Sequence, residues 1–281
     1  MAPGLKAPWF GLRLRAGDSL IGARHATYTS ASLGKAKLKD VVTTAPAGLP
    51  VSTVHEEFSS TSRRKSLYGK IFHFLLPGEG WFAAAQDAEI KRLAPDEAKA
   101  LRDHAKRFQG KLTADELERL RVLTQRVEEL WGFALRRLEL AEENTRRAIP
   151  VWGTDTAEGG DVTRAQIERS LDDENSSYRR LRLVMDAWCA LWFWPVLPED
   201  EVEPPTFSQW LDTLEKILGR TLEVVADRRG ATLHKAGQTI MGSAGGRDEL
   251  DVIESLFGVN GAGAIEDLLE ETPWLKRCTE I

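Results

Sequence analysis

The residues of this sequence that could do chemistry gather between Ser176 and Pro195, in the stretch SSYRRLRLVMDAWCALWFWP. Its three tryptophans are Trp188, Trp192 and Trp194. The basic residues just before them are Arg179, Arg180 and Arg182. Guanidinium groups bind phosphate and aromatic rings stack on bases, so a nucleic-acid contact is the functional alternative for this stretch. The pattern is more typical of a buried scaffold helix, because each large aromatic side chain buries on the order of 150–250 Å².

Two other clusters of charge invite a functional interpretation. A basic run ends a polar segment and consists of Arg63, Arg64 and Lys65. Such a loop is normally solvated, and contact with phosphate is the functional alternative. Three adjacent acids precede the tryptophan-rich stretch: Asp172, Asp173 and Glu174. Adjacent acids in that place are typical of helix caps and not of paired catalytic carboxylates.

No complete catalytic constellation is present in the 281 residues. There is neither a Gly-x-Ser-x-Gly nucleophile element nor a phosphate loop ending in Gly-Lys-Ser/Thr. The five histidines and the two lone cysteines, Cys189 and Cys278, lack metal-ligand spacing. The glycine-rich piece 258–263 follows no convincing strand and is interpreted as a linker. We therefore expect no catalytic residue and no metal site in this chain.

The tryptophan-rich stretch has the period of a helix. Five of its apolar residues recur at steps of three and four and share one face: Tyr178, Leu181, Met185, Trp188 and Trp192. The candidate N-terminal caps are Asp172, Asp173 and Asn175. Pro195 is the expected end, since proline cannot continue a helix.

A longer amphipathic helix is expected before it. Thr113 and Glu116 form a capping-box pattern, and apolar residues then recur at three- and four-residue steps from Leu117 to Ala141. A helix of this extent measures on the order of 50 Å. Its apolar stripe needs a partner, which is either the helix expected over Pro95–Gln109 or the tryptophan-rich helix.

The remaining patterns indicate a mainly α chain with a small β-containing N-terminal part, an α+β class. Strand-like segments are Phe10–Leu14 and Tyr68–Leu76, and residues 31–65 are expected to be loop. Further helices are expected over Thr163–Leu171, Ser208–Leu218, Asp248–Phe257 and Ala264–Glu271. We divide the chain into a β-containing segment 1–82, a helical segment 83–195 and an acidic helical segment 196–281.

Charge is distributed unevenly along the chain. The net charge is −5 overall, but residues 1–82 carry +6 and residues 195–281 carry −9. This asymmetry allows a basic N-terminal surface and an acidic C-terminal one. Lone cysteines fit a reducing cytosol, and neither a run of about eighteen apolar residues nor a signal-peptide pattern occurs. We therefore expect a cytoplasmic protein without a membrane span.

Three stretches, taken together, resemble a known family. They are LRLRAGDSLIG at Leu12–Gly22, IFHFLLP at Ile71–Pro77 and YRRLRLVMDAWCALWFWP at Tyr178–Pro195. In this order they are similar to the long adenine-specific DNA methyltransferases of type IIG restriction–modification and of phage-defence systems such as DISARM and BREX. The resemblance implies an α/β S-adenosylmethionine-dependent methyltransferase with a large helical insertion, which methylates N6 of an adenine flipped out of the duplex.

The sequence departs from that family at two places. Its cofactor loop, a Phe/Asp-x-Gly-x-Gly element, and its catalytic Asn-Pro-Pro-Tyr/Trp/Phe element are both missing. Asp18, within Gly17–Leu20, is the residue that the resemblance places near the cofactor adenine, and a turn aspartate is the alternative. The basic residues implied to contact DNA are Arg63, Arg64, Lys65, Arg179, Arg180 and Arg182.

The resemblance therefore implies an internal segment of a DNA adenine methyltransferase that is inactive alone. The implied cofactor is S-adenosylmethionine, and the implied partners are DNA and another polypeptide that carries the missing motifs. A non-enzymatic helical scaffold or interaction protein of a defence system, without a cofactor site, is the alternative.

Overall fold

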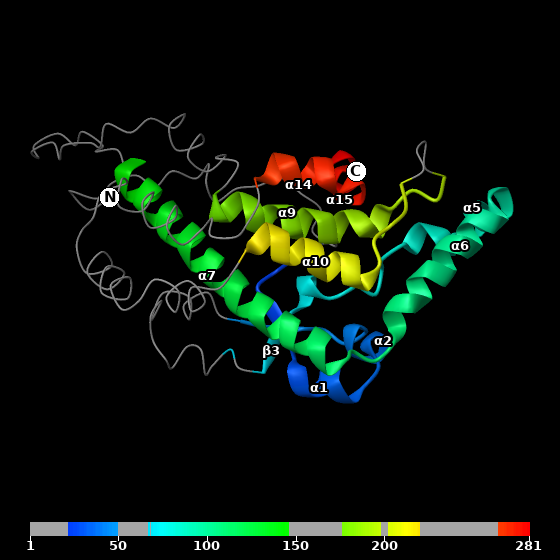
Figure 1. Cartoon of the computed structure of the whole chain (residues 1–281), viewed down its shortest axis with the longest axis horizontal. Helices are drawn as coiled ribbons and strands as arrows, with labels where there is room; N and C mark the ends of the chain where they lie inside the picture. Colours follow the sequence, from blue (N-terminus) through cyan, green and yellow to red (C-terminus); the bar gives the residue numbers. More distant parts are fainter. Residues whose placement is uncertain (1–21, 50–66, 68, 146–175, 198–201, 220–263) are drawn as a thin grey trace, which may run out of the picture.

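The described part of the chain is mainly helical and contains one small antiparallel sheet (Figure 1). The computed structural model describes residues 22–49, 67, 69–145, 176–197, 202–219 and 264–281. This confirms the expected mainly α architecture with a small β part, whereas the larger methyltransferase fold stays a prediction. Three expected elements lie outside the described residues: Phe10–Leu14, Thr163–Leu171 and Asp248–Phe257.

The sheet has three strands, with β1 in the middle. The strands are β1 (Ala26–Thr29), β2 (Ala47–Gly48) and β3 (Lys70–Phe72). β1 pairs antiparallel with both neighbours, so that Thr27 lies opposite Ala47 on one side and Phe72 on the other. β3 is shorter than the expected strand Tyr68–Leu76 because a 3-10 turn, η2 (His73–Leu75), follows it directly.

Two short helices begin in or near the segment 31–65, which the sequence predicted as loop, and that prediction was wrong for them. They are α1 (Ser30–Lys35) and α2 (Leu38–Val42). The Thr29 side chain begins α1 by accepting the Ser32 N–H at 3.3 Å. The side chains that the two helices bury include Leu33, Leu38 and Val41. Helices of one or two turns carry too few apolar residues for a period to be recognised.

The middle of the chain forms a run of short helices and then one long helix. The run consists of η3 (Ala83–Gln86), α5 (Ala88–Leu93), α6 (Pro95–Lys106) and η4 (Arg107–Gln109), and α7 (Ala114–Thr145) follows. Thr113 N–H donates to Glu116 Oε2 at 2.7 Å, and Glu116 N–H donates to Thr113 Oγ1 at 3.2 Å. These two bonds confirm the predicted capping box and the predicted start of the long helix.

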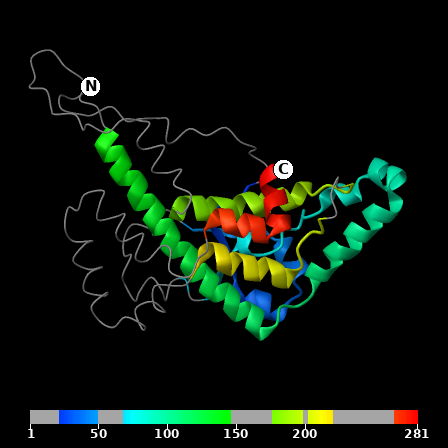
Figure 2. The same cartoon turned by 45° about the horizontal axis from the view of Figure 1, so that its top comes forward.

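Four further helices pack on this framework (Figures 1 and 2). They are α9 (Ser177–Ala190), α10 (Phe207–Leu218), α14 (Ile265–Glu271) and α15 (Pro273–Glu280), with a 3-10 turn η5 (Leu191–Phe193) after α9. α9 and α10 lie side by side against α7, and α14 and α15 pack on them. The tryptophan-rich helix therefore covers the apolar stripe of α7, as one of the two expected partners.

Tryptophan N–H groups connect the helices to the segment that leaves β3. Trp188 Nε1 donates to the Leu76 carbonyl at 2.8 Å, and Trp210 Nε1 donates to the Leu75 carbonyl at 2.9 Å. Trp81 Nε1 donates to the Trp188 carbonyl at 3.1 Å. All three rings are buried, and elements from the three sequence segments meet in this core.

The turn Pro77–Gly80 passes so close to the tryptophans that Gly80 has no room for a side chain and Gly78 has little. A Cβ atom on Gly80 would lie 2.1 Å from a ring carbon of Trp192. A Cβ atom on Gly78 would lie 3.0 Å from atoms of both Trp188 and Trp192. The indole of Trp192 is thus held directly against the backbone of the turn.

We expect Gly80→Ala to lower the free energy of unfolding by roughly 1–3 kcal/mol, because the added methyl group has to displace the Trp192 ring from a packed site. Gly48→Ala is the matched control, since a Cβ atom there would meet nothing within 4 Å. Urea denaturation of both variants measures the difference. Equal stabilities would show that Trp192 is not held against the turn.

His73 is buried in the core, where its surroundings favour the neutral imidazole. Its Nε2 atom lies 3.0 Å from the backbone nitrogen of Arg24 and 3.1 Å from the carbonyl oxygen of the same residue. The ring packs edge-on against Trp188, with 5.2 Å between the centroids. Burial lowers the pKa of His73 from its ordinary value of 6.5 to about 4.

The low pKa of His73 should make the fold sensitive to acid. Between pH 6.5 and 4 this histidine takes up a proton in the unfolded chain but not in the folded one, so stability falls as the pH falls. The loss reaches about 3 kcal/mol at pH 4. His73→Gln should lose correspondingly less over the same range, because its side chain does not titrate. Denaturation of both proteins at each pH measures this, and parallel pH profiles would refute it.

Candidate functional site

The tryptophan-rich helix α9 is a core helix. Ser176 begins it by accepting the Arg179 N–H on its Oγ at 3.2 Å. Trp188 and Trp194 are buried, and Trp192 is partly buried. A stacking platform for bases needs exposed ring faces, so this burial confirms the scaffold interpretation of the helix. The N-terminal cap of α9 is Ser176, which corrects the expectation that Asp172, Asp173 or Asn175 caps this helix.

Arg180 is completely buried, which corrects the expectation that it contacts DNA. Its Nη1 donates to the Ile217 carbonyl at 2.9 Å, and the equally buried Arg126 donates from Nε to the Leu218 carbonyl at 2.7 Å. Both guanidinium groups therefore bind the C-terminal end of α10, where the helix dipole favours positive charge. Burial, followed by the nearby charge of Arg126, lowers the pKa of Arg180 to about 10.

Arg179 and Arg182 are exposed on α9 and remain candidates for contact with DNA. Arg182 Nε donates to Asp186 Oδ2 at 3.2 Å. An exposed pair of this kind contributes little to stability, so a phosphate group could replace the carboxylate. The other site residues predicted from the sequence lie outside the described residues: Asp18, Arg63, Arg64 and Lys65.

A groove of about 560 Å³ lies between the sheet, the connection that follows α2, and α9. Its aromatic lining residues are Tyr28, Trp188 and Trp192. Arg24 and Glu79 are exposed at the groove and supply one positive and one negative group. The size falls in the range of small-molecule sites. Gly22, the last residue of the first stretch that resembles the methyltransferases, also lines the groove.

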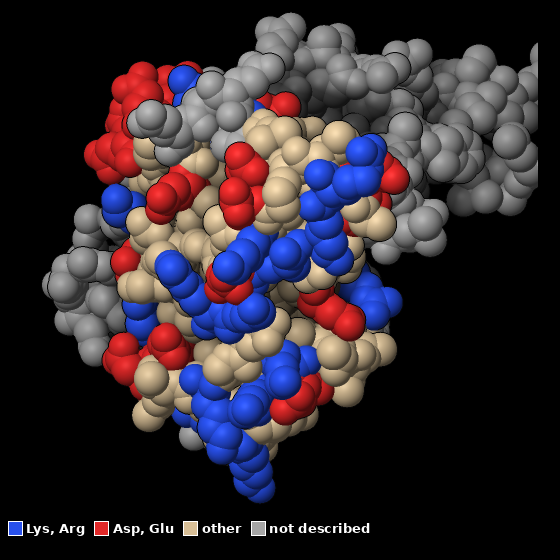
Figure 3. Space-filling model, turned by 90° about the vertical axis from the view of Figure 1, so that its right-hand side faces the viewer, with Lys and Arg blue, Asp and Glu red and all other residues tan. Residues whose placement is uncertain are grey.

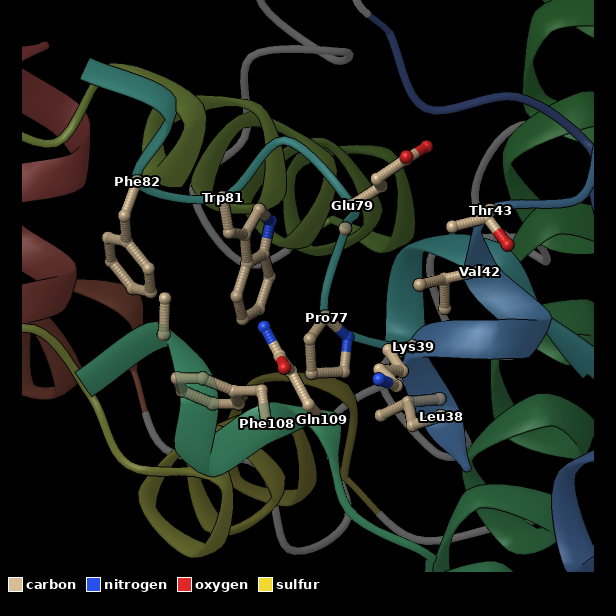
Figure 4. A pocket seen from close by; sticks show the side chains of 12 residues that line it. Leu38, Lys39, Val42, Thr43, Pro77, Glu79, Trp81, Phe82, Phe108 and Gln109 are labelled. Atoms are coloured by element: carbon tan, nitrogen blue, oxygen red, sulfur yellow. The ribbon is translucent and has the colours of Figure 1, made fainter. Parts of the chain in front are cut away.

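A smaller hollow of about 210 Å³ lies between α2, the turn after Pro77 and the end of α6 (Figure 4). Its apolar walls include Leu38, Val42, Pro77, Trp81, Phe82 and Phe108. Lys39 and Gln109 add polar groups, and the Gln109 amide extends toward Trp81 while Glu79 points away. Sequence reasoning missed this hollow, because its walls come from three elements that no single period connects.

A basic face covers the side of the molecule formed by α5, α6 and α2 (Figure 3). Its exposed basic residues include Lys37, Lys39, Lys91, Arg92, Lys99, Lys106, Arg107 and Lys111. The sequence signal for part of it was present, because Lys99 and Lys106 lie seven residues apart on one face of α6. Acidic residues interspersed in the same segment obscure this signal.

The described residues hold no cluster of three or more His, Cys, Asp or Glu side chains that could bind a metal ion. Within the same residues, no helix combines the length and apolar character needed to cross a membrane. Burial raises the pKa of the Cys278 thiol to about 12 and also raises that of Cys189, so neither thiol is a ready nucleophile.

Comparison of the chain with protein-family models, with curated proteins and with solved structures finds no significant match. The function is therefore argued from the residues and their geometry.

The two kinds of arginine on α9 should differ in their effect on stability. We expect Arg180→Ala to cost about 1–3 kcal/mol, because it leaves the buried Ile217 carbonyl without its donor. Arg182→Ala removes an exposed pair and should change stability by no more than about 0.5 kcal/mol. Chemical denaturation measures both, and equal effects would mean that Arg180 does not hold α10.

Proposed function

We propose that this chain is part of a DNA N6-adenine methyltransferase that uses S-adenosylmethionine and serves restriction–modification or phage defence. In this proposal the described residues form the helical section that packs on the methyltransferase core, and the chain does not transfer a methyl group by itself. The residues that hold the methionine end of the cofactor and the target amine lie outside these 281 residues, on another polypeptide.

The observation that carries the proposal is the contact between the second and third stretches that resemble the family, beside the end of the first. The first ends at Gly22, and Arg24 just after it contacts His73 of the second stretch at 3.0 Å. Trp188 of the third stretch donates to Leu76 of the second at 2.8 Å. Residues of the second and third stretches that lie 112 positions apart in sequence thus belong to one structural unit, as a common methyltransferase core requires.

The groove that begins at Gly22 supports the cofactor part of the proposal. Its aromatic walls suit a planar ring such as adenine, and Arg24 and Glu79 offer charges of both signs. S-adenosylmethionine carries an adenine ring, a carboxylate and positive groups. Asp18 is proposed to contact the cofactor adenine from the segment just before the groove. Arg179 and Arg182, with the run 63–65, are proposed to contact DNA phosphates.

The purified chain should transfer no measurable methyl group from labelled S-adenosylmethionine to unmethylated DNA, because it has no Asn-Pro-Pro element to bind the target amine. Deleting its gene in the organism that encodes it should remove N6-methyladenine from a defined sequence motif. Sequencing that detects the modified base measures this loss. Returning the gene should restore the modification.

Two outcomes would overturn different parts of the proposal. Robust turnover by the chain alone would refute the division of the enzyme between polypeptides but would support the methyltransferase class. An unchanged methylation pattern after deletion would refute the class itself. Loss of phage resistance without any change in methylation would instead support the alternative, a helical scaffold protein of a defence system.

A further inference from the structure

Four exposed basic side chains lie together where α2 meets the end of α6. The Leu38 N–H donates to the Gly110 carbonyl at 2.8 Å, which bonds the start of α2 to the residue that follows η4. This bond brings Lys37 and Lys39, which flank Leu38, to the side of Lys111, which follows Gly110. Arg107 begins the η4 turn that α2 contacts. We call the resulting group the α2–η4 rim, and it consists of Lys37, Lys39, Arg107 and Lys111.

The four cations of the rim have no ion-pair partner among the described residues. In the part of the chain that the structure describes, none of them has a carboxylate within 4.0 Å. Two other cations of the same face are paired, since Arg92 binds Glu89 at 2.8 Å and Lys106 binds Asp103 at 2.7 Å. Unpaired cations gathered on one face attract and hold an anionic ligand.

The smaller hollow opens beside this rim. Lys39 belongs to both, and Gln109 stands between Arg107 and Lys111 in the sequence and lines the hollow. At about 210 Å³ the hollow is smaller than a typical drug-sized site and suits one ring system. The Gln109 amide extends toward Trp81, is exposed, and has no hydrogen-bond partner among the described residues (Figure 4). It can both donate to and accept from the edge of a planar ring.

We propose that the α2–η4 rim and the hollow bind a single strand of nucleic acid, with phosphates on the rim and one unstacked base in the hollow. Cations that follow the backbone, an apolar ring-sized hollow and an amide for the base edge are the three parts of such a site. An acidic peptide would satisfy the rim, but a nucleic acid supplies both the anions and a planar ring whose edge can donate to and accept from Gln109. The site lies apart from Arg179 and Arg182 and does not depend on methyl transfer.

The rim is tested with a fluorescent oligothymidylate whose binding to the full chain is measured over a range of salt concentrations. Removing two phosphate contacts should lower the slope of log affinity against log salt by about 1.4. We expect this fall for Lys37→Gln/Lys39→Gln and for Arg107→Gln/Lys111→Gln. Lys216→Gln/Lys276→Gln is the control with the same change of charge, made on α10 and α15, and should leave the slope unchanged.

The hollow is tested with an abasic strand of the same length and charge. The strand with bases should bind the wild-type chain roughly tenfold more tightly than the abasic strand. Ala105→Phe fills the hollow from α6 and should abolish that preference while leaving the salt slope unchanged. Gln109→Ala, which removes an exposed side chain, should weaken the preference without any effect on folding.

Each contrary result is distinct. Equal binding of the two strands, together with displacement by poly-glutamate, would show a surface for acidic proteins and refute the inference. A slope that falls only in Arg179→Gln/Arg182→Gln would place the nucleic acid on α9, refuting the inference while leaving the proposed function intact. Loss of methylation in the gene deletion is measured separately, so failure of either proposal is recognised independently.

Discussion

The hydrogen bonds from Trp188 and Trp210 to the carbonyls of Leu76 and Leu75 are the interaction on which the rest of the structure depends. These carbonyls belong to a buried segment that has left the sheet, so no strand neighbour can satisfy them. Each would cost about 1–3 kcal/mol if left without a donor. Because the two indoles come from α9 and α10, meeting this requirement fixes both helices against the sheet at once.

The surface features follow from the same constraint. Once the indoles hold the segment after β3, the turn Pro77–Gly80 has to pass over the ring of Trp192, and only glycine allows the contact. The turn then lies between the groove and the smaller hollow, since Pro77, Gly78 and Glu79 line both of them. The groove is lined by aromatic rings and by charged groups of both signs, whereas the smaller hollow borders the α2–η4 rim. One buried network thereby sets the shapes of two different candidate sites.

The elements that the sequence predicted correctly are those whose signal is local. The capping box at Thr113 and Glu116 and the proline at the first turn of α6 are side-chain to backbone effects within one turn. The burial of Arg180 has no such local signal. Its guanidinium group is buried because it binds a carbonyl at the end of α10, and α10 is distant from Arg180 in the sequence. Periodicity shows which residues share a face but not what covers it, so the sequence pattern alone predicts a DNA contact for an arginine that lies in the core.

The placement of charge completes the argument for where an anionic ligand binds. The acidic helix α14 packs on α10, where Lys216 lies 3.4 Å from Glu271, and in both views it lies across α9 and α10 from α1 and α2 (Figures 1 and 2). Arg126 and Arg180 are buried and donate hydrogen bonds to carbonyls at the C-terminal end of α10. They therefore add no positive charge to the surface. The α2–η4 rim adds four unpaired cations to the basic face among the described residues, while the acidic side repels phosphate. Although the chain is acidic as a whole, this separation gives it one face suited to a polyanion.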